Sequence, residues 1–306
     1  MTQLKIIFLG TGGSWPTVYR NVSSIAIKRG KEVIIFDCGE GTQRQLQKSK
    51  ISYMQISKIF ITHFHGDHFL GIPGLIQTMQ LNDRKEPLYI YGPKGIIKLV
   101  DDLLSLGYFK PNYKIEAFEV DENDKIDFEG YSIIPFKVKH GVPSLGYSLI
   151  ENIRPGKFDK EKALSLGIPE GPLFSKIQKG KTITLDNGKK ITSNMILGPS
   201  RKGRKIVISG DTAPIEKMIV YAKDADVLIH EATFSSEFID IAADYGHTTA
   251  NQAAEIAKSA KVKKLYLTHI SPRHLDYKRL LNEAQNIFKK SFIPKDFEEI
   301  EVKLKK

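Results

Sequence analysis

Four potential metal ligands stand close together in the stretch His63-Phe64-His65-Gly66-Asp67-His68. Imidazole and carboxylate groups are the ligands that zinc and similar divalent ions take in proteins. Because side chains alternate along an extended chain, His63, His65 and Asp67 should point to one side, and a turn at the glycine should bring His68 round to join them. The spacing predicts a catalytic metal site, in preference to a histidine-rich surface loop or a purely structural zinc.

Further candidate ligands stand where other apolar segments end. The run 58–62 before the cluster is predicted to be a buried strand. Three later runs, 131–139, 205–210 and 264–268, lead into His140, Asp211 and His269. Sites in α/β proteins form at the carboxyl ends of strands, so we expect these residues to join the first cluster. A carboxylate can bridge two cations, and two ions about 3.5 to 4 Å apart form a clamp that hydrolyses phosphate esters.

The rest of the chain alternates between predicted strands and helices. Strands are expected at 4–9, 33–36 and 226–229, and helices at 41–49, 75–81 and 96–106. The glycines of 10–15 resemble a dinucleotide-binding turn only superficially, because the third glycine of that pattern is missing and a proline follows. We instead expect this turn to let the backbone approach the active site.

The spacing His-x-His-x-Asp-His, followed by an isolated His, an Asp and a His on later strands, resembles the metallo-β-lactamase superfamily. The resemblance covers most of the chain. It implies an α/β fold, a four-layer αβ/βα sandwich with two zinc ions at one edge. For the reaction it implies only metal-assisted hydrolysis, because one fold can host many chemistries.

Composition limits the class of protein. The chain has 306 residues with 41% hydrophobic content, enough for one packed domain over 1–306, and no apolar stretch approaches the roughly 20 residues needed to cross a bilayer. The start shows no signal-peptide pattern, so we expect a cytoplasmic protein without a membrane partner. The single Cys38 excludes an internal disulfide and is predicted to lie in the core. A net charge of +11 favours a polyanionic partner, although a solvated lysine-rich face would have the same charge.

The segment at about 152–200 interrupts the alternation of strands and helices with Gly and Pro clusters. Between 153 and 181 it has seven basic residues against three acidic ones, Arg154, Lys157, Lys160, Lys162, Lys176, Lys179 and Lys181 against Asp159, Glu161 and Glu170. Its apolar residues argue for an ordered protrusion: Phe158, Leu164, Leu166, Ile168, Leu173 and Phe174. We predict an inserted basic arm that holds an RNA backbone, the alternative being a solvated lid.

Several sequence motifs together resemble the ribonuclease Z family, whose members are endonucleases that remove the 3′ trailer from precursor tRNA. They are the segments 36–45, 63–68, 209–213, 230–233 and 247–249, with Gly171-Pro172 in the arm. The resemblance spans nearly the whole chain and is more specific than the metal motif alone. It implies a homodimer in which the arm of one subunit holds tRNA that the other cuts. The arm residues expected to bind substrate are Gly171, Pro172, Lys176, Lys179 and Lys181.

The resemblance also implies the metal assignments. One zinc ion would be held by His63, His65 and His140, the other by Asp67, His68 and His269, with Asp211 shared. Manganese or another divalent ion is an alternative with such ligands. A water between two zinc ions loses a proton near neutral pH, and the family treats Asp67 as general base.

The departing 3′ oxygen needs a proton, and the resemblance assigns this to His247, oriented by Glu231. A carboxylate partner would raise the imidazole pKa. Taken alone, Glu231 could cap a helix, and the segment 247–249 could simply begin one. His230 is predicted to be structural or to support the ligands, and His274 to lie at the surface.

One loop departs from the family. Many members have Pro-x-Lys-x-Arg-Asn where this chain has Pro16-Thr17-Val18-Tyr19-Arg20-Asn21, so Val18 replaces a lysine. Arg20 and Asn21 remain as expected contacts to nucleotides at the scissile bond. Whether cleavage falls after the discriminator base or beyond CCA stays open. The competing hypotheses are a small-molecule phosphodiesterase or other hydrolase of this fold, and an RNA-binding protein whose site has decayed.

Overall fold

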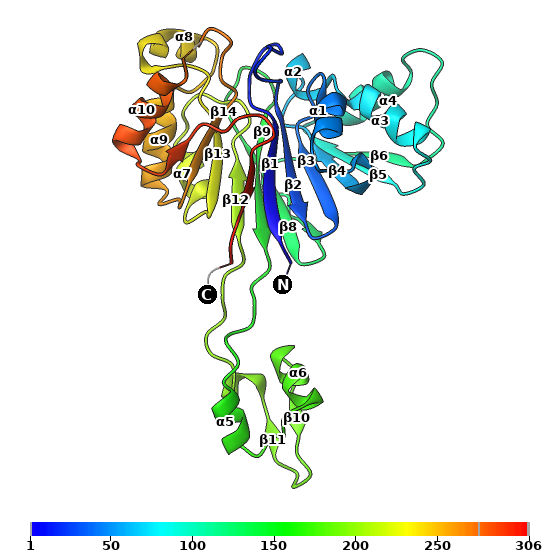
Figure 1. Cartoon of the computed structure of the whole chain (residues 1–306), viewed down its shortest axis with the longest axis vertical. Helices are drawn as coiled ribbons and strands as arrows, with labels where there is room; N and C mark the ends of the chain where they lie inside the picture. Colours follow the sequence, from blue (N-terminus) through cyan, green and yellow to red (C-terminus); the bar gives the residue numbers. More distant parts are fainter. Residues whose placement is uncertain (1, 275, 305–306) are drawn as a thin grey trace.

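Two seven-stranded sheets face each other in the computed structural model, which describes residues 2–274 and 276–304 (Figure 1). In spatial order the first sheet has β16 (Glu299–Glu301), β1 (Leu4–Gly10), β2 (Ser24–Arg29), β3 (Glu32–Phe36), β4 (Ile56–Phe60), β5 (Leu88–Gly92) and β6 (Ile115–Glu119). The second has β15 (Ser291–Phe292), β14 (Leu265–Thr268), β13 (Val227–Glu231), β12 (Lys205–Ile208), β9 (Leu145–Glu151), β8 (Tyr131–Lys137) and β7 (Ile126–Phe128).

Helices cover the outer face of each sheet. The first sheet is covered by α1 (Thr42–Lys48), α3 (Ile72–Leu81) and α4 (Ile96–Leu104), with the short α2 (Gly66–Phe69) above it. The second is covered by α7 (Lys217–Ala222), α9 (Ala250–Ser259) and α10 (Lys278–Ile287), with α8 (Ile239–Asp244) above. A third apolar core lies between the sheets. These layers confirm the predicted αβ/βα sandwich.

The strands end where the candidate ligands begin. Strands β3, β4 and β5 pair in parallel, as do β12, β13 and β14, so within each set the carboxyl ends share one edge of the sheet. The expected strands and helices are all present, with ends shifted by a few residues. The helix expected at 75–81 begins earlier, at Ile72. Pro73 fits in its first turn because N–H groups there have no hydrogen-bond partner within the helix, so the N–H that proline lacks is not missed.

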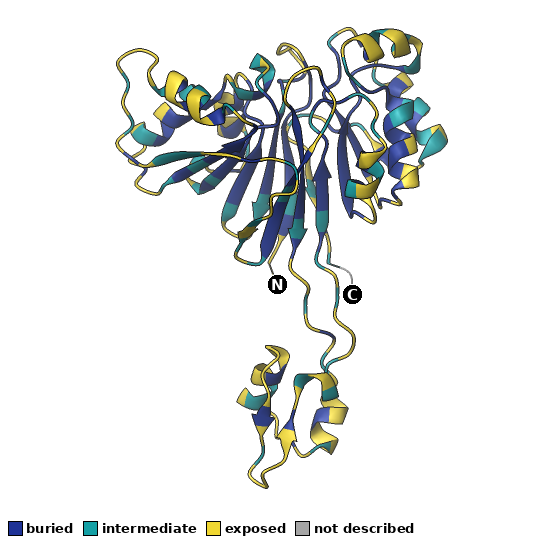
Figure 2. Cartoon of the chain, turned by 180° about the vertical axis from the view of Figure 1, so that it is seen from behind, coloured by how far each residue is buried: buried dark blue, intermediate teal, exposed yellow. Residues whose placement is uncertain are grey.

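The segment expected to be an arm leaves the body after β9 and returns before β12, at the edge of the sheets far from the ligand cluster (Figure 1). It contains α5 (Lys160–Ser165), α6 (Pro172–Gln178), β10 (Ile183–Thr184) and β11 (Lys190–Ile191). Its own small core is formed by Ala163, Ile168, Ile177, Ile183, Ile191 and Ile196. Leu164 does not join this core, since it is 45% exposed. Figure 2 shows that the two connecting segments are largely exposed.

Buried ion pairs anchor the arm where it meets the body. The Glu151 carboxylate, at the end of β9, accepts hydrogen bonds from Arg204 Nε at 2.6 Å and from Arg204 Nη2 at 2.7 Å. Arg29 Nε adds a third at 3.2 Å. Arg204 also donates to the carbonyls of Thr2 and Val302, near both ends of the described chain. Since the pair is buried and fully hydrogen-bonded, it holds the two arm segments in a defined position at the body.

Two expectations from composition can be compared with the structure. Cys38 is completely buried, which confirms it as a core residue, and burial raises the pKa of its thiol to about 12. Within the described residues, no helix has both the length and the apolar character that a membrane span requires.

Candidate active site

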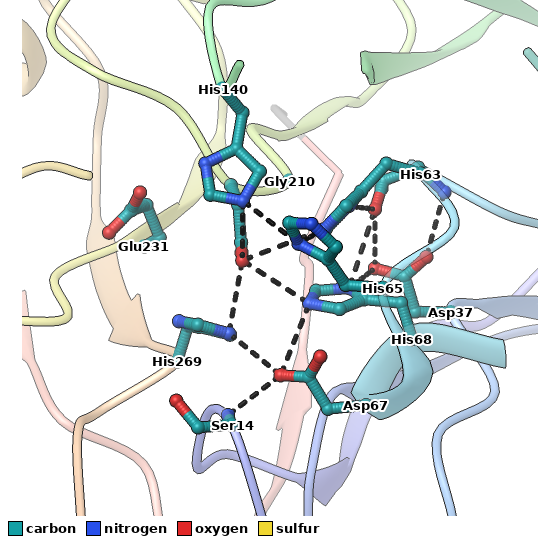
Figure 3. Close-up of polar contacts among 12 residues, drawn as sticks. Ser14, Asp37, His63, His65, Asp67, His68, His140, Gly210, Glu231 and His269 are labelled. Atoms are coloured by element: carbon teal, nitrogen blue, oxygen red, sulfur yellow. Dashed lines mark hydrogen bonds and ion pairs between the residues drawn. The ribbon is translucent and has the colours of Figure 1, made fainter. Parts of the chain in front are cut away.

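One carboxylate oxygen lies among four imidazoles at the edge where the strands end (Figure 3). Asp211 Oδ2 is 3.1 Å from His269 Nε2 and 3.3 Å from His68 Nε2. The same oxygen lies 3.7 Å from His140 Nε2 and 3.9 Å from His63 Nε2. A shared carboxylate in this position can bridge two cations.

The remaining ligand candidates form one group on each side of this oxygen. On one side His65 Nδ1 lies 3.0 Å from His63 Nε2 and 3.2 Å from His140 Nε2. On the other, Asp67 Oδ2 lies 3.2 Å from His269 Nε2 and 3.6 Å from His68 Nε2. The ligand atoms within each group lie within 4.8 Å of one another. The structure therefore brings all seven residues expected to bind metal into one cluster.

Hydrogen bonds outside the cluster orient the imidazole rings. His68 Nδ1 donates to Asp37 Oδ2 at 2.8 Å, and His140 Nδ1 donates to the Gly246 carbonyl at 2.9 Å. His269 Nδ1 lies 2.9 Å from Thr233 Oγ1, whose hydroxyl donates to Glu231 and so accepts from the ring. In these three rings Nδ1 is committed outward and Nε2 faces the centre, which is how metal-binding histidines are held.

The donor set fits divalent cations. His68 Nε2 is buried and, of the atoms that the structure describes, has no hydrogen-bond partner, which is costly unless a further group occupies its lone pair. Burial and neighbouring histidines hold the pKa of His63 well below its usual value, so its ring is neutral and able to ligate. Burial would raise the pKa of Asp211, but His269 and His68 outweigh it and lower the pKa, so the carboxylate is charged.

A second pair of residues stands beside the cluster. His247 Nδ1 donates to Glu231 Oε1 at 2.9 Å, and the His247 ring centre lies 4.7 Å from that of His140. Glu231 is the last residue of β13 and is buried, so it is not a helix cap. Burial alone would lower the pKa of His247, but the Glu231 carboxylate outweighs it and raises the pKa to about 9. The pair is therefore a buried carboxylate holding a protonated imidazole.

The glycine turn after β1 approaches the site, as expected. A side chain at Gly13 would come within 2.4 Å of the His269 ring, so only glycine allows this contact. The next backbone N–H, of Ser14, donates to Asp67 Oδ2 at 2.7 Å. His269 itself has a φ of 56°, a left-handed conformation that costs about 1 to 3 kcal/mol and is typical of functional sites.

Relatives of known name match almost the entire chain. Ribonuclease Z of Methanosarcina acetivorans is 47% identical, with the match covering 98% of each chain. Ribonuclease Z of Archaeoglobus fulgidus is 44% identical over 97% of each. The chain belongs to the ribonuclease Z family.

Other comparisons match the fold of this chain. The family model described as a beta-lactamase superfamily domain matches residues 173–270, and that of the anti-Pycsar protein Apyc1 matches 4–153. The solved structure of the short form of human tRNase Z has a TM-score of 0.72 and 28% identity, covering 98% of this chain and 100% of the human one. The metallo-beta-lactamase fold protein YhfI of Bacillus subtilis has the same TM-score at 19% identity, which supports the fold alone.

Two placements expected from the sequence are wrong. Arg20 was expected to face nucleotides, but its guanidinium is buried, donates to Thr11 Oγ1 and the Pro294 carbonyl, and lies 4.1 Å from the centre of the Tyr277 ring. His274 was expected at the surface but is only 9% exposed, because Phe234 and Phe238 pack against its ring. Both residues are held by contacts to distant parts of the chain.

Asn21 and His230 take the following positions. Asn21 Nδ2 donates to the Glu40 carbonyl at 2.8 Å, beside the glycine turn. His230 is fully buried and donates through Nδ1 to the Glu231 carbonyl, and among the described residues it joins none of the potential metal-binding groups. These positions suit a supporting role for His230.

Two residues that hold the site together were not expected from the sequence. Asp37, directly after β3, accepts from His68 and from the backbone N–H of Thr62. Thr233 links His269 to Glu231. The sequence did hold a signal for Asp37, because it directly follows a strand end, as the candidate ligands do. That strand, β3, is parallel to β4, which leads into His63. For Thr233 the sequence offers no comparable signal.

Proposed function

We propose that this chain is a two-metal endoribonuclease that removes the 3′ trailer from precursor tRNA, leaving a 3′-hydroxyl on the tRNA and a 5′-phosphate on the trailer. Its membership of the ribonuclease Z family supports the reaction and the substrate. The observation that carries the two-metal site is the Asp211 oxygen placed between two three-residue ligand groups. The single buried cysteine suits the reducing cytoplasm in which we place the enzyme.

In this proposal the two groups hold separate ions. His63, His65 and His140 would hold one, Asp67, His68 and His269 would hold the other, and Asp211 would be shared. Zinc suits the ligand types, with manganese as the alternative. When bound, such a pair of ions supplies Lewis acidity and makes water available as a nucleophile near neutral pH. The Asp67 carboxylate, fixed by Ser14 N–H, is placed to accept a hydrogen bond from that nucleophile.

The leaving 3′ oxygen requires a proton, and His247 is the residue placed to provide it. Its Nδ1 is engaged by Glu231, so the proton that it can transfer is on Nε2. Because Glu231 raises the pKa of His247 to about 9, most of the imidazole holds that proton at neutral pH. Glu231 is in turn fixed by the backbone N–H of Thr212 at 2.8 Å, so it orients the acid and does not itself act on substrate.

The first experiment incubates purified enzyme with precursor tRNA that carries a 3′ trailer, with and without a chelator, and maps the ends. We expect one cut near the acceptor end, lost with the chelator and restored by divalent metal. The mapped end also decides between cleavage after the discriminator base and after CCA. Turnover of a small phosphodiester without any precursor cleavage would instead support the small-molecule phosphodiesterase alternative.

We expect His247→Ala to reduce the kcat for precursor tRNA by about 10²- to 10⁴-fold, the usual contribution of a general acid. The 3′ oxygen of RNA is a poor leaving group and depends on that proton. The kcat for bis(p-nitrophenyl) phosphate should fall much less, because p-nitrophenolate departs without protonation. The measurement is kcat for both substrates under saturating conditions. Equal losses on the two substrates would remove His247 from the role of acid.

The position of the arm supports action across a dimer. The arm starts at Glu151, whereas Leu145 at the other end of β9 hydrogen-bonds to Thr62 beside the ligand cluster. At about 3.4 Å per residue, the arm therefore begins roughly 20 Å from its own active site and extends away from it. A tRNA held by the exposed Gly171, Pro172, Lys176, Lys179 and Lys181 would reach the site of a second copy more readily. We therefore propose a homodimer in which each arm serves the partner.

A further inference from the structure

The loop 12–20 lies directly against the ligand cluster. Ser14 N–H donates to Asp67 Oδ2 at 2.7 Å, and Gly13 fits under the His269 ring with no space for a side chain. Residues that follow Ser14 in the loop are therefore close to the place where a scissile phosphate would bind.

Contacts with the C-terminal part of the chain hold the base of this loop. The Asp296 carboxylate accepts from Thr11 Oγ1 and from the backbone N–H of Asn21, both at 2.7 Å, and so ties the two ends of the loop together. Arg20 is buried under Tyr277 and donates to the Pro294 carbonyl at 2.7 Å. Within the loop, Thr17 N–H donates to the Arg20 carbonyl at 2.8 Å. With its base fixed at this many points, the loop presents its tip in a defined direction.

The tip exposes large apolar side chains. Trp15 is 56% exposed, Val18 95% and Tyr19 81%. In the part of the chain that the structure describes, neither the Trp15 nor the Tyr19 ring packs against another aromatic ring. Grouped exposed apolar residues beside an active site indicate a binding surface, because exposure has no benefit for folding.

The tip has no charge, which limits what it can bind. The segment Trp15-Pro16-Thr17-Val18-Tyr19 contains no Lys, Arg, Asp or Glu, and the neighbouring Arg20 is turned inward. Such a surface lacks the cations that hold a phosphate. Aromatic rings, however, stack on unpaired nucleobases, and each such contact is worth about 1 to 3 kcal/mol. RNA ends are the places where unpaired bases are available for this contact.

We propose that Trp15 and Tyr19 form a stacking surface for the unpaired nucleobases that flank the scissile phosphate of precursor tRNA. The proposal rests on the proposed tRNA reaction and adds specificity-determining residues to it. At this loop the enzyme holds the RNA by its bases, since the tip has no cation for the phosphate backbone.

Alanine substitutions test the surface. Trp15→Ala and Tyr19→Ala should each raise the KM for precursor tRNA about tenfold, whereas Trp15→Phe and Tyr19→Phe should restore most of the loss, because phenylalanine also stacks. Tyr108→Ala is the matched control, since Tyr108 is fully exposed in the loop after α4. A KM for both alanine variants equal to that of the control would overturn the proposal.

Abasic substrates separate stacking from a merely structural effect. Precursors that lack one base, either just before or just after the scissile bond, should bind the unaltered enzyme more weakly at one or both positions. The alanine variants should lose little more on the sensitive abasic precursor, because the contact is already absent. If the loss of binding caused by the alanine substitution and the loss caused by the missing base were fully additive, direct stacking would be contradicted.

Fluorescence gives an independent measurement, because Trp15 is the only tryptophan in the chain. Its emission should change on rapid mixing with intact precursor and change less with the sensitive abasic precursor. An identical response to both would count against the proposal. Cleavage of precursor tRNA by the unaltered enzyme tests the proposed function separately, so either idea can fail alone.

Discussion

Replacing Asp211 by asparagine is expected to reduce cleavage of both precursor tRNA and bis(p-nitrophenyl) phosphate by at least about a thousandfold. One Asp211 oxygen lies within 3.9 Å of four imidazole nitrogens, so the substitution removes a negative charge from the middle of both ligand groups. Neutral asparagine cannot balance two cations. The loss should be common to both substrates because it affects the reaction centre and not substrate recognition.

The measurement combines kcat/KM on the two substrates with the number of metal ions bound per chain. We expect Asp211→Asn to bind fewer ions than the unaltered enzyme while it retains its fold by circular dichroism. Asp101→Asn is the matched control, because Asp101 is exposed on α4. A variant at position 211 with full metal content and full activity would refute the bridging role.

Removing the arm is expected to lower kcat/KM for precursor tRNA by about a hundredfold or more, while hydrolysis of bis(p-nitrophenyl) phosphate changes less than about threefold. Cleavage of precursor tRNA falls because contacts between the arm and RNA phosphates are lost. Hydrolysis of the small substrate hardly changes because the arm lies far from the ligand cluster. The structure sets the boundaries. Arg154 and Arg201 exchange backbone hydrogen bonds at 2.8 and 2.9 Å, so residues 155–200 can be replaced by Asn-Gly as a two-residue hairpin turn.

A matched control separates the arm from general charge. Substituting Lys176, Lys179 and Lys181 together by alanine should weaken tRNA binding and reduce its salt dependence, whereas the same change at Lys258, Lys289 and Lys290 on the body should not. Equal effects of the two triple substitutions would assign binding to net charge alone.

Mixing variants tests the arrangement across a dimer. The arm-deleted chain and the Asp211→Asn chain should each be inactive on precursor tRNA. Together they should regain activity, because a mixed dimer has one intact arm opposite one intact site. Mixtures that stay inactive although the chains associate would mean that each arm serves its own site.

The cluster of candidate ligands was predictable from sequence because its determinants are local. His63, His65, Asp67 and His68 are neighbours in one stretch, and His140, Asp211 and His269 each follow an apolar run that could only be a strand. Strand direction then brings those ends to one edge. The fold followed from the same spacing, through its resemblance to a known superfamily.

Residues held by long-range contacts were placed wrongly or missed. Arg20 looked available to substrate, but Tyr277 and the Pro294 carbonyl bury it. Asp37 appeared as part of a motif, yet its carboxylate fixes the His68 ring. In each case the partner lies far along the chain, and no local pattern indicates which two side chains will meet.

Residue types and their spacing were enough to predict which residues can bind metal, at which strand ends they lie, and that a basic insertion follows β9. The orientation of each imidazole, the departure of the arm from the edge opposite the site, and the contact of loop 12–20 with Asp67 through Ser14 appear only in the folded chain, as does the exposure of Trp15 and Tyr19. The physical reason is that residue type and spacing act within a few residues of chain. Orientation depends on contacts such as that of Asp296 with Thr11, which form only when the sheets have packed.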